Sequence, residues 1–178
     1  MEIVQQRINL IEASLERLRA RLPDLPINEV LILRLVLLLA HEFNLLLEHE
    51  IRPFGLGEGE FRVLTALFSQ PEGIAHPSEL CARASQSPAN MSRISDALVR
   101  RDLITRGACA EDRRRMVLRI TETGEDLVRN LLPTIFGPLR DIYRSHSADD
   151  QQQLIALLKR LEARVNEQLS DGGAESTA

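Results

Sequence analysis

The sequence predicts a mainly α-helical chain that carries one small β-hairpin. Apolar residues recur every three or four positions over most of the 178 residues, which is the period of a helix. Between residues 104 and 120 the apolar residues alternate instead, which is the period of a strand. Charged residues are also distributed unevenly along the chain. Residues 83–119 hold 9 basic and 4 acidic side chains, net +5, in a chain whose net charge is -4. A basic segment between acidic flanks is typical of a polyanion-binding face.

The amino-acid composition argues against several classes of protein. A chain of 178 residues can bury a core without covalent staples. Two cysteines, Cys81 and Cys109, are too few for a disulfide scaffold, so a reducing compartment fits. Aromatic residues make up only 3%, which argues against base stacking on single strands. The most apolar stretch, residues 30–40, contains Arg34 and is judged too short for a bilayer, and no leader opens the chain. We therefore expect a cytoplasmic protein without membrane contact.

Residues 1–52 predict two helices. An apolar stripe at spacings of three and four continues to Leu22, where prolines follow. The second helix is expected to begin after Asn28 as its N-cap and to end near Ile51. Residues 30–39 are apolar on nearly every side, so this helix needs cover that a second copy of the chain would supply. We expect residues 1–52 to serve dimerisation.

Three shorter helices are expected next. Apolar residues between Phe61 and Phe68 mark the first of them. Pro77 opens a short helix. Ser87 is a good N-cap and Pro88 suits the first helical position, so a third helix begins there and ends near residue 102.

Residues 104–106 and 116–120 predict two strands around a polar tip at residues 107–115. The alternation in the second strand places Met116, Leu118 and Ile120 toward the core and Val117 and Arg119 toward solvent.

Two more helices are expected in residues 122–169, which we assign to dimerisation. Thr121 caps the first, and Pro133 is expected to bend or break it. Ser147 and Asp150 suggest a capped start for the last helix. Its apolar residues trace a heptad-like seam through Leu154, Leu158, Leu161, Val165 and Leu169. Residues 170–178 are expected to form a flexible tail.

The order helix, turn, helix, strand, basic tip, strand describes a winged helix-turn-helix lobe over residues 53–121. The second helix of such a lobe enters the major groove of double-stranded DNA, so its outer face should be small and polar. Asn90 could read an adenine, and Arg93 a guanine or a phosphate. The predicted contacts are Ser87, Pro88, Ala89, Asn90, Ser92 and Arg93, and Ser95 is placed on the same outer face.

The tip of the hairpin suits the neighbouring minor groove. Arg113, Arg114 and Arg115 are its expected DNA contacts, because an arginine inserts well where the groove focuses negative potential. Asp112 would repel DNA directly, so we interpret it as a brace that aims one of these arginines.

Each signal also has a plainer explanation. A start rich in serine and asparagine is often only an N-cap, and an arginine run is often only a solvated turn. A metal sensor would need closer ligands than His41 and His49, and no CxxC or HExxH motif occurs. Cys81 or Cys109 could support a redox sensor. A helical adaptor would explain the apolar helices but not the arginine tip. No nucleophile elbow or phosphate loop supports an enzyme.

The segments "ELCARASQSPANMSRISDALVRRDLI" and "EDRRRMVLRITETG" resemble the winged helix of the MarR family of bacterial regulators. "LPINEVLILRLVLLLAHEFN" and "HPSEL" are similar to its EmrR branch, which represses multidrug efflux operons. The tip "GACAEDRRR" departs from the more usual charged or proline-containing turn.

The resemblance implies a homodimer whose first and last helices pair and whose two lobes read a pseudo-palindromic operator. It implies no cofactor. It also implies release from DNA by a small amphipathic inducer, and repression of an efflux operon and of the protein's own gene. The candidate residues for inducer binding are His41, Leu45, Phe61, Leu64 and Phe68.

Overall fold

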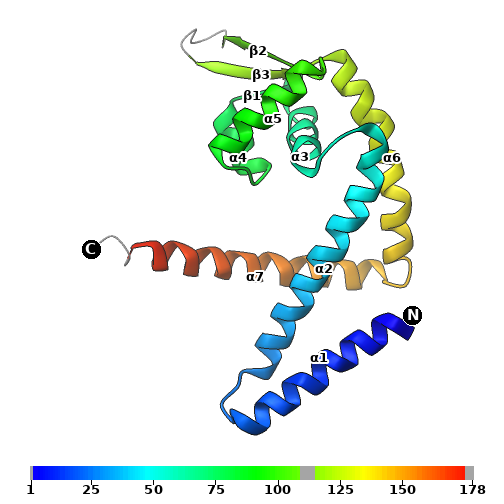
Figure 1. Ribbon diagram of the computed structural model, residues 1–178, viewed down its shortest axis with the longest axis vertical. Coiled ribbons are helices and arrows are strands. Elements are labelled where there is room, and N and C mark those ends of the chain that lie inside the picture. Colours follow the sequence, from blue (N-terminus) through cyan, green and yellow to red (C-terminus); the bar gives the residue numbers. More distant parts are fainter. Residues whose placement is uncertain (1, 109–114, 175–178) are drawn as a thin grey trace. The chain divides into compact units, whose positions relative to one another are not determined.

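The computed structural model describes residues 2–108 and 115–174 and is shown in Figure 1. The chain forms two compact units, residues 1–128 and 129–178. Its elements in order are α1 (Glu2–Arg21), α2 (Ile27–Ile51), the 3₁₀ turn η1 (Arg52–Phe54), α3 (Glu58–Phe68), the 3₁₀ turn η2 (Pro71–Gly73), β1 (Ile74–Ala75), α4 (Pro77–Arg83), α5 (Pro88–Arg100), β2 (Ile104–Ala108), β3 (Met116–Ile120), α6 (Glu122–Tyr143) and α7 (Ala148–Ala174). The predicted mainly α-helical fold with a small hairpin is confirmed.

The two predicted N-terminal helices are present, and an ion pair of 2.8 Å between Arg7 and Glu42 joins them. The predicted N-cap is wrong. Pro26 occupies the N-cap position of α2, Asn28 already lies inside the helix, and no side chain caps this end. The ring of Pro26 holds its φ at -74°, close to the helical value, and the helix begins two residues earlier than an N-cap at Asn28 would allow.

Helix α2 is rich in apolar residues, and Ile51 is its only buried residue. By length and composition alone the segment Ile27–Phe54 could cross a membrane. The prediction that the apolar stretch is too short for a bilayer is therefore wrong, because the helix continues well past residue 40. The same apolar surface is what a helix covered by a second subunit would show.

The helices α3, α4 and α5 pack beside a three-stranded antiparallel sheet of order β1-β3-β2 (Figure 1). The core between them is aliphatic and fully buried, with Val63, Leu64, Leu67, Leu80, Met91, Ile94, Leu98, Ile104 and Leu118 as its main residues. Strand β1 is only two residues long and escaped prediction, because two residues carry no period.

The predicted facing of β3 is wrong at two positions. Met116 is 50% exposed, whereas Val117 is buried. The prediction assumed a simple hairpin, but β3 is the central strand of the sheet. Met116 lies beyond the residues that pair with β1, so it extends past the covered part of the sheet. Leu118 and Ile120 are buried and Arg119 is exposed, as predicted.

The start of α6 sits unusually close to the end of α5. The Thr121 backbone N–H donates to the Leu103 carbonyl at 3.1 Å, and the Thr121 hydroxyl donates to the Asp102 carbonyl at 2.7 Å. Gly124, in the first turn of α6, lies directly against Leu103. A Cβ at this position would overlap the Leu103 carbonyl oxygen and touch Ile120. Only glycine fits here.

Helix α6 continues through Pro133 and Pro138 to Tyr143, so the expected break is absent. A proline inside a helix removes one backbone hydrogen bond, and the bonds on either side keep the helix continuous. Helix α7 has the predicted capped start, since the backbone N–H of Ser147 donates to Asp150 and that of Asp150 donates to the Ser147 hydroxyl. The Ser147 hydroxyl and then its backbone N–H lower the pKa of Asp150. Helix α7 extends to Ala174, into the expected tail.

Candidate nucleic-acid interface

The helix-turn-helix consists of α4, a turn at residues 84–87 and α5. Ser87 is the N-cap of α5, as predicted, and its hydroxyl accepts a hydrogen bond of 3.3 Å from the Asn90 backbone N–H. Pro88 occupies the first turn, where its missing N–H leaves no bond unmade. In the turn, Ser85 adopts a positive φ of 52°. The local sequence therefore dictates where α5 begins and which residues its first turn presents.

Helix α5 has one buried face and one polar face. Met91, Ile94 and Leu98 are buried in the core. Of the predicted contacts, Ser87, Pro88, Ala89, Ser92 and Arg93 are exposed and Asn90 is half-buried. Ser95 was wrongly placed on the outer face. It is only 3% exposed, and its hydroxyl donates to the Met91 carbonyl at 2.7 Å. Ser95 lies one turn after Met91 and so shares its inward direction.

Asn90 and Arg93 form one polar unit on α5. The Arg93 guanidinium donates to the Asn90 side-chain oxygen through Nε at 3.2 Å and Nη2 at 2.8 Å. The Asn90 amide nitrogen donates in turn to Gln86. Both polar groups of Asn90 are therefore engaged, and its oxygen aims the guanidinium of Arg93. The spacing of three residues places Asn90 and Arg93 on one face of α5, and Gln86 lies in the turn just before the helix.

The N-terminus of α5 keeps its positive pole. Helices α3, α4, α6 and α7 each carry acidic residues in the first turn, but α5 carries none. An acidic side chain there would offset the partial positive charge of the unpaired backbone N–H groups. Without one, the end of α5 suits an external anion such as a DNA phosphate.

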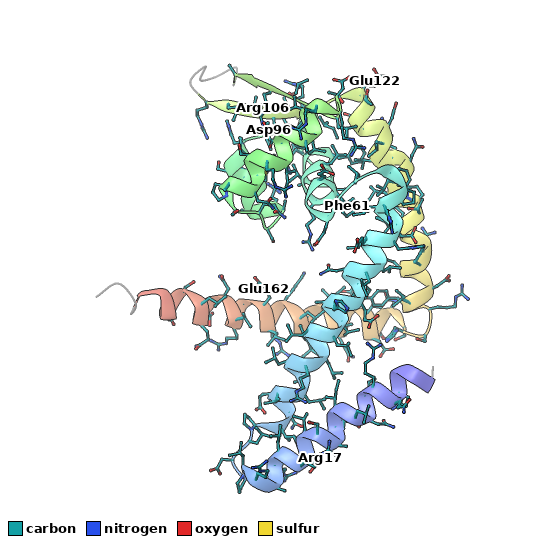
Figure 2. The ribbon with its side chains drawn as sticks, viewed as in Figure 1. Arg17, Phe61, Asp96, Arg106, Glu122 and Glu162 are labelled. Carbon is teal, nitrogen blue, oxygen red and sulfur yellow. The ribbon has the colours of Figure 1, made fainter. Side chains whose placement is uncertain are left out.

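The predicted wing is the β2–β3 hairpin. Arg115 is exposed next to the first residue of β3, whereas Asp112, Arg113, Arg114 and Cys109 lie outside the described residues. An ion pair of 2.5 Å between Arg106 of β2 and Asp96 joins the wing to α5 (Figure 2). This pair could not be predicted from the sequence, because ten residues and a change of element separate its members.

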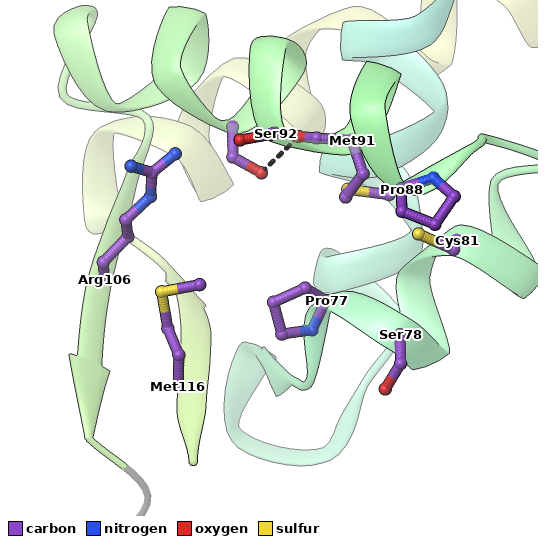
Figure 3. A pocket seen from close by; sticks show the side chains of 9 residues that line it. Pro77, Ser78, Cys81, Pro88, Met91, Ser92, Arg106 and Met116 are labelled. Atoms are coloured by element: carbon purple, nitrogen blue, oxygen red, sulfur yellow. Dashed lines mark hydrogen bonds between the residues drawn. The ribbon is translucent and has the colours of Figure 1, made fainter. Parts of the chain in front are cut away.

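A hollow of about 450 Å³ lies between α4, α5 and the strands β2 and β3 (Figure 3). Its wall is mostly apolar, with serine hydroxyls and the Arg106 guanidinium as polar groups. The lining residues are Pro77, Ser78, Cys81, Pro88, Met91, Ser92, Ser95, Arg106 and Met116. Pro88 and Ser92 are also predicted DNA contacts, so an occupant of the hollow would touch the DNA-binding helix itself.

The five candidates for inducer binding do not line this hollow. His41 and Leu45 are exposed on α2, and Phe61 and Phe68 are half-buried on α3. Leu64 is fully buried in the core. Their role stays a prediction.

Among the described residues, no observation favours a metal-sensing or a redox-sensing regulator. Within residues 2–108 and 115–174, no group of three potential ligands lies close enough for a metal ion. Cys81 is a free, half-buried thiol in the wall of the hollow.

Comparison with known proteins decides the family. A profile of the MarR family matches residues 54–115, which is the winged lobe. The chain is 32% identical over 165 residues to the transcriptional repressor MprA of Escherichia coli K12, which covers 91% of this chain and 92% of MprA. The chain belongs to the MarR family.

Two solved structures of the MarR family share the fold. One is the regulator AbsC of Streptomyces coelicolor, with a TM-score of 0.72 and 23% identity over 79% of this chain and 95% of AbsC. The other is a Streptomyces coelicolor MarR regulator in complex with DNA, with a TM-score of 0.68 and 20% identity over 76% and 86% of the two chains. The resemblance to the EmrR branch is confirmed by MprA. The chain is a MarR-type transcriptional regulator and not an enzyme.

Proposed function

We propose that the protein is a ligand-released, homodimeric repressor that binds a pseudo-palindromic operator. The observation that carries this proposal is the start of α5. Its positive pole is free of acidic residues, small side chains surround it, and Arg93 is aimed outward by Asn90. Such an end fits a major groove, with phosphate at the helix terminus and a guanidinium at a guanine edge.

Exposed apolar residues support the homodimer. In α2 these residues include Ile32, Leu33, Leu37 and Leu39, and in α7 they follow the predicted seam through Leu154, Leu158, Leu161, Val165 and Leu169. A monomer rarely exposes so many large apolar side chains on one helix. A two-fold pairing would bury them and would hold two α5 helices at half-sites one helical turn apart.

For regulation, we propose an amphipathic inducer that binds better to an arrangement unsuited to DNA. Linkage then requires DNA and inducer to weaken each other by the same factor. The apolar hollow beside α5, with Arg106 at its edge, is a second candidate site for the inducer next to the five residues named from the sequence. We further propose a multidrug efflux operon and the protein's own gene as targets, and the cytoplasm as its location.

The test is a fluorescence-anisotropy titration with DNA from upstream of the protein's own gene, at near-physiological salt and with excess random DNA. Binding that survives the competitor supports the proposal, and candidate amphipathic compounds are then added to look for release. If the upstream DNA binds no better than random DNA, an unbiased selection of DNA sequences follows. A selection without any enriched sequence would refute the proposal.

Replacing Arg93 with alanine should remove discrimination at one operator base pair, at a cost of about 1–3 kcal/mol. Asn90→Ala should affect the same base pair, because Asn90 acts by aiming Arg93. The double variant should then cost no more than Arg93→Ala alone. Anisotropy against operators with single base-pair changes measures this cycle, with Arg100→Ala as the control. Additive losses at two different base pairs would instead show that Asn90 reads a base itself.

Replacing both Arg113 and Arg115 with alanine should weaken binding to all DNA sequences by about 30-fold near 0.15 M salt. It should also reduce the slope of log K against log salt by about 2, because each lost phosphate contact removes about 0.9 from that slope. The control removes the same charge from α1 through Arg17→Ala with Arg19→Ala, both exposed. A loss confined to one base position would contradict the wing assignment.

A further inference from the structure

Arg101, the C-cap residue of α5, contacts the connector between α2 and α3. Its guanidinium donates to the Gly55 carbonyl at 2.8 Å and to the Phe54 carbonyl at 2.9 Å. The carboxylate of Glu60 lies 3.9 Å away. The Arg101 side chain is only 33% exposed, so these bonds are partly shielded from water. Both terminal nitrogens of the guanidinium thus donate to neighbouring carbonyls of one turn.

This connector is the place where α2 meets the winged lobe. Within α2 only Ile51 is buried, and after the 3₁₀ turn η1 the next buried residue is Leu56. Gly55 turns the chain with a positive φ of 68°, and the Leu56 N–H reaches back to the Ile51 carbonyl. The junction between α2 and the winged lobe is therefore short. Two side-chain hydrogen bonds from Arg101 join it to the C-terminal end of α5.

The chemistry favours arginine for this contact. The carbonyls at the end of a helical segment carry partial negative charge, which a cation stabilises. The planar fork of arginine reaches two carbonyl oxygens at once in a fixed geometry, whereas the ammonium of lysine is a compact point charge without that fork. The neighbouring Arg100 is exposed and makes no ion pair with any residue that the structure describes.

We propose that Arg101 is a positioning residue that sets the angle between α2 and α5 and so determines the operator spacing that the repressor accepts. This inference rests on the proposed function, since it needs two half-sites bound by one dimer. Helix α5 has 13 residues, which makes it about 20 Å long at 1.5 Å per residue. A turn of about 10° at its C-terminus would shift its N-terminus by about 3.5 Å, which is the rise of one base pair.

The test uses the full-length protein and an operator obtained by selection with the wild type. Arg101→Gln and Arg101→Lys are compared with Arg100→Gln, which removes the same charge from the adjacent residue. Anisotropy measures binding to a single half-site, to the selected operator, and to operators with one or two base pairs added or removed between the half-sites. Thermal melting confirms that each variant is folded.

Arg101→Gln should bind the half-site within about 2-fold of the wild type, lose about 10-fold on the selected operator, and respond less to altered spacing. Arg101→Lys, which keeps the positive charge but loses the planar fork, should fall in between, and it still tests the proposal if the glutamine variant does not fold. Arg100→Gln should keep the spacing preference of the wild type.

Three outcomes would overturn the proposal. They are an unchanged spacing preference in Arg101→Gln, an equal loss on half-site and full operator, and wild-type behaviour of Arg101→Lys. If the wild type selects no DNA at all, the proposed function fails, which is a different result from failure of the Arg101 contact.

Discussion

Replacing Leu161 with glutamate should convert the protein to a monomer and abolish tight operator binding. Leu161 is 40% exposed on α7, in the seam with Leu154, Leu158 and Val165. In a two-fold dimer each substitution changes the interface at two positions, one in each subunit. Two lost leucine side chains at up to about 3 kcal/mol each amount to about 6 kcal/mol, which weakens dimerisation about 10⁴-fold. The buried carboxylates add a further penalty.

Sedimentation or light scattering at several protein concentrations measures the dimer, and anisotropy measures operator binding. The control is Ala156→Glu, which adds the same charge on the opposite, exposed face of α7. The control should stay dimeric. If Leu161→Glu also stays dimeric, α7 is not in the interface and the apolar surface of α2 becomes the next candidate.

The second large effect is expected from Gly124→Ala in the first turn of α6. The added methyl group would overlap the Leu103 carbonyl oxygen and press on Ile120. Both are parts of a rigid junction, so the backbone must shift. Overpacking of this kind costs about 1–3 kcal/mol or more. We expect the free energy of unfolding to fall by about 3 kcal/mol, with a lower melting temperature.

Gly137→Ala provides the matched control on the same helix. A Cβ there meets no atom within 4 Å. Alanine should therefore leave stability unchanged or raise it by about 0.5–1 kcal/mol, because glycine is the weaker helix former. Denaturant unfolding of both variants tests the pair. Equal behaviour of the two would mean that the close approach at Gly124 is not needed for the fold.

Features that depend on neighbouring residues could be predicted from the sequence. Ser87 and Pro88 mark the start of α5 because capping acts within one helical turn. The capped start of α7 at Ser147 follows the same rule. The link between Asn90 and Arg93 could also be predicted, since a spacing of three residues brings side chains together on a helix.

Features that depend on tertiary contacts could not be predicted. The exposure of Met116 follows from β1, which pairs with only part of β3. The pair of Arg106 with Asp96 and the bonds of Arg101 to the connector join segments that only the fold brings together. The residues next to an arginine in the sequence do not determine whether its side chain contacts DNA, a carboxylate or a backbone carbonyl. The clustering of basic residues therefore predicted where the winged lobe lies, but not which group each arginine contacts.

The exposed seam of α7 has a consequence for genetics. In the proposed dimer, pairing and DNA reading use different residues, so a variant without Arg93 should still dimerise with wild-type subunits. With equal amounts of the two subunits, only about a quarter of the dimers would carry two intact lobes. Alleles that damage the recognition helix should therefore act as dominant negatives, whereas alleles that damage the α7 seam should be recessive.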